Sequence, residues 1–209
     1  MNIKSATLLV IIGMICSLSI RTVGTLFPGI FQNIHIVHTA IGTHLFSSAA
    51  LVHFFITLYG QWIPKEQRRL KLACILAIIG SLAALFLHGK SLLLVLEIDV
   101  LPLLVMHHHT DAMLPLVSSS LVLLFFVFLR VEMGHRASEG LRRATDCAIA
   151  GFSVFMILHA IVLVNYSRSG TFQWLEHFPG TMAVGGALVF ACAAAAILCF
   201  FISFYRFKQ

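Results

Sequence analysis

Apolar residues along this chain gather into long runs that are separated by short polar stretches. Six runs are typical of membrane-spanning helices, and they cover about Ala6–Ile20, Thr39–Tyr59, Leu72–Leu87, Leu114–Leu129, Cys147–Val164 and Thr181–Phe204. In hydrocarbon only a helix or a closed barrel satisfies every backbone N–H and C=O group, and runs of this length favour helices. The pattern therefore predicts an all-α, polytopic integral membrane helix bundle, with residues 1–209 forming a single transmembrane domain.

A seventh apolar run, Ser91–Met106, is harder to assign because Glu97, Asp99 and Pro102 lie within it. It follows His88–Lys90, which we interpret as a tight turn that ends the third span. We expect seven hydrophobic helices in total. Whether the fourth of them crosses fully, giving seven spans, or lies at the surface, giving six, stays open.

Charge distinguishes the two arrangements. With six spans, the basic loops 60–71 and 130–143 share one side of the membrane with Lys4 and Arg206, as the positive-inside rule prefers. With seven spans the two loops fall on opposite sides. We expect both loops to be cytoplasmic, and we expect the mixed segment Thr22–His38 to form a loop or an interfacial stretch.

Composition agrees with a membrane location and narrows the partners. Hydrophobic residues make up 59% of the chain and charged residues 11%, and the mean hydropathy is +0.97. The net charge of +6 comes from basic residues beside the ends of apolar runs. That placement predicts contact with the lipid bilayer and its anionic headgroups, and no nucleic-acid binding.

The last apolar run is rich in small residues, including Gly185, Gly186 and the stretch Ala193–Ala196. Small residues let helix backbones approach closely. This helix is therefore predicted to pack tightly, either within the chain or against a membrane protein partner.

Two of the eleven histidines fit a haem site. His44 lies about six residues from one end of the second run, and His159 lies about seven residues from the same-side end of the Cys147–Val164 run. At 1.5 Å per residue their depths agree to within roughly 2 Å. A single b haem with two histidine ligands on different helices is therefore a candidate cofactor.

A divalent transition metal is the second candidate cofactor. Asp99, His107 and His109 offer the carboxylate and imidazole ligands that zinc, copper or iron accept, provided that Pro102 kinks the segment between them. Such a site could activate water for hydrolysis. Glu97 and Asp99, two positions apart on a helix, point away from each other and do not form a catalytic pair.

The stretch LEIDVLPLLVMHHHTDAML resembles the transmembrane protein 45 family, whose seven-helix members carry an acid followed by His-x-His near the end of the fourth helix. The resemblance places the acid at Asp99 or Glu97 and the histidines at His107 and His109. The family's further histidine pair is missing from Leu114–Ser120. The resemblance implies a helical membrane architecture and assigns no chemistry.

Three functions follow from these patterns, and whether the protein is an enzyme stays open. The leading hypothesis is a packing or scaffolding subunit that binds membrane partners through the Gly/Ala-rich last helix. The alternatives are a b-type cytochrome-like redox protein using His44 and His159, and a metal-dependent membrane hydrolase using Asp99, His107 and His109.

Overall fold

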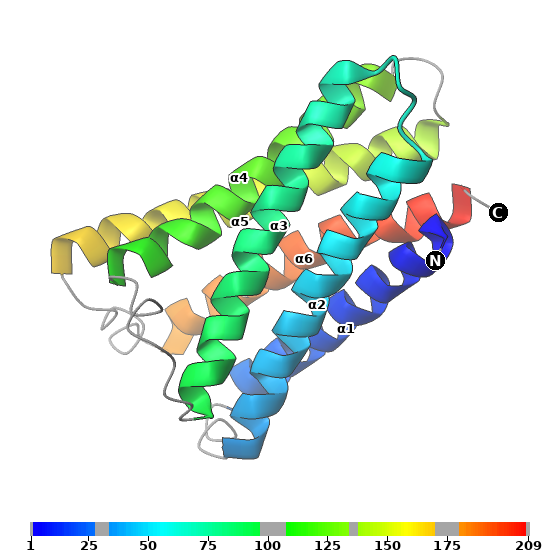
Figure 1. Ribbon diagram of the computed structural model, residues 1–209. Coiled ribbons are helices and arrows are strands. Elements are labelled where there is room, and N and C mark those ends of the chain that lie inside the picture. Colours follow the sequence, from blue (N-terminus) through cyan, green and yellow to red (C-terminus); the bar gives the residue numbers. More distant parts are fainter. Residues whose placement is uncertain (1, 28–33, 97–107, 134–137, 170–179, 208–209) are drawn as a thin grey trace.

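The computed structural model describes residues 2–27, 34–96, 108–133, 138–169 and 180–207, and this part of the chain folds into six long helices (Figure 1). Their bounds are α1 Ile3–Leu26, α2 Ile34–Gln61, α3 Arg68–Val95, α4 His108–Met133, α5 Glu139–Ser169 and α6 Gly180–Phe207. All six are long and apolar enough to cross a membrane. They support the prediction of an integral, multi-pass membrane protein.

The expected count of seven helices is not supported, because α3 continues through the predicted turn at His88–Lys90 and ends at Val95. Within the bundle, a turn there would leave backbone groups without partners, which is costly in an apolar environment. The polar His88 side chain does not require the helix to end there, because the Ser48 hydroxyl of α2 forms a hydrogen bond with His88 Nδ1 at 2.9 Å. Residues 97–107, which held the rest of the expected fourth helix, lie outside the described residues.

Other helix ends also extend beyond the predicted spans. Arg21, expected to end the first span, lies inside α1, and much of the expected loop Thr22–His38 is helical on either side of residues 28–33. Likewise α4 runs to Met133 and α5 begins at Glu139, which shortens the second basic loop. In a sequence, a charged residue after an apolar run suggests that the helix ends there. In the structure, the helix can continue past that residue if its side chain finds a partner.

The helices form an antiparallel ring in which each packs against its neighbours in sequence, and α1 packs against α6 to close it. We call the end with Lys4, the α2–α3 loop and Arg206 the basic end, and the opposite end the histidine end. Both basic loops flank helix termini at the basic end, as the six-span arrangement requires. Their cytoplasmic placement stays a prediction.

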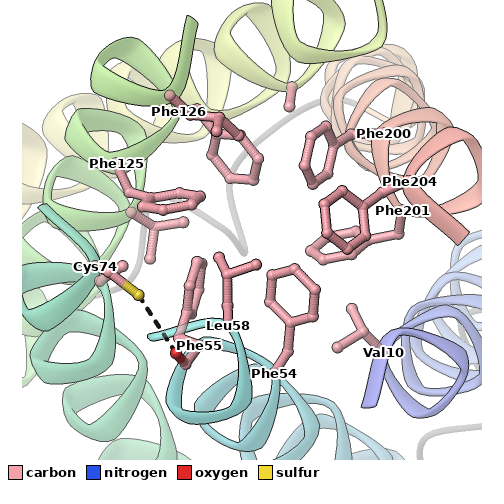
Figure 2. Close-up of a cluster of buried hydrophobic side chains, with 14 of the residues drawn as sticks. Val10, Phe54, Phe55, Leu58, Cys74, Phe125, Phe126, Phe200, Phe201 and Phe204 are labelled. Atoms are coloured by element: carbon pink, nitrogen blue, oxygen red, sulfur yellow. Dashed lines mark hydrogen bonds between the residues drawn. The ribbon is translucent and has the colours of Figure 1, made fainter. Parts of the chain in front are cut away.

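The fully buried core lies in the basic half of the ring and is filled mainly by phenylalanine (Figure 2). Phe54 and Phe55 of α2 meet Phe201 of α6 and Phe125 of α4 edge to face, with ring centroids 5.1 and 5.0 Å apart. Such aromatic pairs contribute about 0.5–1.5 kcal/mol beyond area burial. Large apolar residues elsewhere point outward to lipid, among them Ile56, Ile79, Val131, Ile157 and Leu188.

Three glycines set how closely neighbouring helices approach. A Cβ on Gly13 of α1 would lie 2.9 Å from the Cα atom of Ser47, and one on Gly80 of α3 would lie 2.9 Å from the Ser118 carbonyl oxygen. The tightest contact joins α5 to α6, where a Cβ on Gly151 would meet the Ala193 oxygen at 2.6 Å. The pairs α1–α2, α3–α4 and α5–α6 are thus held at backbone contact distance.

The six-helix topology predicts that the two basic loops label from one side of the membrane. In a cysteine-free background, Glu66→Cys and Ser138→Cys should react with an impermeant thiol reagent from the same side, and Phe27→Cys from the other. Labelling of residues 66 and 138 from opposite sides would instead indicate an additional membrane crossing between them, as in the seven-span arrangement.

The Gly151 contact predicts a specific loss of stability. Gly151→Ala should destabilise the protein by about 1–3 kcal/mol, because neither the α6 backbone nor Ile197 has room for the added methyl group. Gly42→Ala is the matched control, since a Cβ there meets nothing within 4 Å and alanine favours the helix by about 0.5–1 kcal/mol. Thermal unfolding in detergent compares the two. Equal melting temperatures would contradict the contact.

Candidate functional site

Two histidine rings from neighbouring helices stack at the histidine end of the bundle. The rings of His44 in α2 and His88 in α3 lie with centroids 5.4 Å apart and planes inclined by 23°. One turn of α2 beyond His44, the buried Ser48 hydroxyl bonds His88 Nδ1 at 2.9 Å. This bond fixes the position of the His88 ring and leaves its Nε2 without a hydrogen-bond partner among the described residues.

A third histidine, His159 of α5, is held in the same way from α4. Its Nδ1 lies 3.3 Å from the Ser119 hydroxyl oxygen. The same hydroxyl lies within hydrogen-bond distance of the Pro115 and Leu116 carbonyls, at 2.8 and 3.1 Å. The contact with Ser119 engages Nδ1 of His159, so Nε2 is the ring nitrogen left for another partner.

A permanent cation accompanies the three rings. The Arg21 guanidinium of α1 lies 3.6 Å from the ring centroid of Phe190 in α6, a cation–π contact. It interacts electrostatically with His44, His88 and His159. We call these four residues, with Ser48 and Ser119, the arginine–histidine cluster.

The cluster lies within membrane-spanning helices rather than at their ends. His44 follows the first residue of α2 by ten positions, and His159 precedes the last residue of α5 by ten. Ionisable groups at such depths are costly to place in hydrocarbon and mark functional sites by default. Imidazole nitrogens with available lone pairs can ligate a metal-centred cofactor, and a guanidinium can pair with a carboxylate or phosphate.

Two of these residues, His44 and His159, were predicted from sequence as a haem pair, and that pairing stays a prediction. The other members of the cluster were not predicted. Arg21 was interpreted as the end of a span and His88 as part of a turn, so neither was counted as interior. Arg21 and His88 are recognisable as interior residues only once α1 and α3 are known to continue past them.

The predicted metal site stays a prediction. Asp99 and His107 lie outside the described residues, and so does the side chain of His109. Where the structure does describe side chains, no three or more of His, Cys, Asp and Glu gather in a way that could hold a metal ion.

No family model, curated protein or solved structure matches the chain. The resemblance to the transmembrane protein 45 family rests on residues 96–114, of which residues 97–107 lie outside the described part. It stays a prediction.

Two adjacent serines test the contact to His159. Ser119 and Ser120 both donate to carbonyls one turn back in α4, but only Ser119 bonds the ring. Ser119→Ala should therefore cost about 0.5–1.5 kcal/mol more than Ser120→Ala, the usual net value of one hydrogen bond. Unfolding measured in the same detergent gives the difference. Equal losses would contradict the bond.

Proposed function

We propose that the protein is a b-type redox membrane protein that binds one haem at the arginine–histidine cluster and passes single electrons through its iron. The observation that carries this proposal is the stacked pair His44 and His88 inside the membrane-spanning bundle. His159 on α5 and the Arg21 cation on α1 add a third ring and a fixed charge at the histidine end. A bis-histidine haem needs two such rings on different helices.

The ring order of the helices suits a cofactor held between them. Because neighbours in sequence are neighbours in space, α2 and α5 occupy opposite positions in the six-helix ring, and α3 lies next to α2. His159 and one histidine of the stacked pair His44 and His88 would hold the haem. Such a cofactor would bridge the two sides of the bundle.

The hydrogen bonds to serine favour ligation through Nε2. A ligating histidine donates its other ring N–H to a neighbouring acceptor, which fixes its orientation. His159 and His88 both have Nδ1 bonded to a serine on a neighbouring helix. His44, the partner expected from sequence, is held by stacking alone among the described contacts. We therefore propose that His159 and His88 would hold the haem, with His44 stacked on His88.

Arg21 would act on the haem through charge. A guanidinium beside the cofactor offsets propionate charge and raises the reduction potential, because a fixed cation favours the electron-rich ferrous state. The phenylalanine core fills the interior in the basic half of the bundle (Figure 2). It would keep water from the iron on that side.

The scaffolding alternative would use the small residues of α6. In α6, Ala193 and Ala194 are buried within the chain, and Ala193 packs on Gly151, so these small residues serve internal packing. Ala195 is exposed and would face lipid or a partner. The hydrolase alternative rests on Asp99, His107 and His109, whose side chains lie outside the described part, and stays a prediction.

The haem proposal predicts a visible spectrum. Protein purified in detergent after expression with added haem precursor should show a Soret band and, on reduction with dithionite, the sharp α band of six-coordinate iron. His159→Ala and His88→Ala should each abolish the six-coordinate signature. His53→Ala is the control, because its Nε2 contacts Thr57 of its own helix, outside the cluster.

The variants also separate the two candidate pairs. Loss in His44→Ala with retention in His88→Ala would assign the pair expected from sequence and overturn the assignment of His88. A folded, colourless protein that takes up no haemin would reject the haem and leave the scaffolding hypothesis in place. Stoichiometric zinc in a colourless protein would favour the hydrolase.

A further inference from the structure

A second charged site lies at the opposite end of the bundle, where α4 ends and α5 begins. Five charged side chains line a concavity of about 300 Å³ between these helices, and they are Arg130, Glu139, Arg142, Arg143 and Asp146. This site shares no residue with the arginine–histidine cluster and does not depend on the haem proposal.

Two of the three arginines are paired with acids. Arg130 Nε of α4 donates to Asp146 Oδ1 of α5 at 2.6 Å, which ties the two helices together across the concavity. Arg143 pairs with Glu139 one turn earlier on α5. Both side chains of that second pair are more than 70% exposed, at 78% and 73%, so water weakens their attraction. The lining keeps one positive charge in excess.

Arg142 supplies the excess charge and an unused donor. Its Nε is buried and has no hydrogen-bond partner among the described residues. A buried donor without an acceptor costs about 1–3 kcal/mol, more when it is charged, so an acceptor at this point would be strongly favoured. Arg142 also lies in the first turn of α5, where the positive end of the helix dipole attracts anions.

The surroundings favour a lipid over a free ion. Val127 and Val131 lie four residues apart on one face of α4, and they are 40% and 68% exposed. Arg130 lies three residues after Val127, at the edge of this apolar strip. An acyl chain can lie along such an apolar strip while its headgroup reaches the arginines. Basic pockets between helices at the end of a span recognise phosphate-bearing headgroups in this way.

We propose that the concavity between α4 and α5 binds the phosphate of an anionic phospholipid headgroup. The phosphate lies against Arg142 and the α5 N-terminus, with Arg130 and Arg143 at its sides and Glu139 and Asp146 limiting the total charge. A phosphodiester with one negative charge matches the single excess positive charge of the lining. The site would anchor the α4–α5 connection at the membrane surface.

The test compares lipid adducts of the delipidated, detergent-purified full chain by native mass spectrometry. Phosphatidylglycerol, phosphatidylcholine and inorganic phosphate are titrated separately. The wild-type protein should hold one phosphatidylglycerol more tightly than phosphatidylcholine. Arg142→Gln should weaken that affinity roughly tenfold, as expected for one charge-assisted hydrogen bond. Arg69→Gln, an exposed arginine at the same end but outside the concavity, should change it less than about twofold.

Each remaining outcome decides the proposal. Equal losses in the two variants would overturn it in favour of diffuse attraction by the basic end. Binding of inorganic phosphate without a preference for phosphatidylglycerol would overturn the lipid as the source. If Arg142→Gln does not fold, Arg142→Lys keeps the charge but lacks the Nε donor and should weaken binding by roughly threefold. Unchanged affinity in that variant would also overturn the proposal.

Discussion

The need to bond every backbone N–H and C=O group inside the helix governs this protein from end to end. In hydrocarbon no water can take over these groups, so ending a helix within the membrane costs more than carrying an unfavourable side chain through it. This explains why α1 continues past Arg21 and α3 past His88. Each of these polar side chains then needs a partner inside the bundle. Arg21 lies over the Phe190 ring, and His88 forms a hydrogen bond with Ser48.

Close fit rather than burial from water holds the helices together. Lipid tails are as apolar as the phenylalanine core, so the core stabilises the ring only through better contacts than lipid offers. Edge-to-face rings between α2, α4 and α6 provide such contacts in the basic half, and Gly151 lets α5 approach α6 closely there. Among the residues whose side chains the structure describes, few in the histidine half are fully buried, and this is where the polar cluster lies. Packing and chemistry are thus divided along the bundle axis.

How much the sequence could predict depends on which force sets each feature. Hydropathy located all six spans, because membrane-spanning helices need long apolar runs. It misplaced their ends, because Arg21 and the sequence His88–Lys90 resemble loop residues when their partners are unknown. Depth arithmetic could place His44 and His159 at similar depths because both runs were correctly located, and their pairing stays a prediction. The contacts of His88 with His44 and Ser48 depend on helix rotation, which one sequence does not fix.

The three consecutive serines Ser118–Ser120 show how one helix sets the chemistry of another. The Ser118 carbonyl lies against Gly80 and fixes the distance between α3 and α4, while Ser120 bonds only within its own helix. Ser119 bonds the Pro115 carbonyl of its own helix and also contacts His159 Nδ1 at 3.3 Å. The orientation of the His159 ring on α5 is therefore set by the local bonding of α4. A ring held at Nδ1 has Nε2 as the nitrogen that can bind a cofactor.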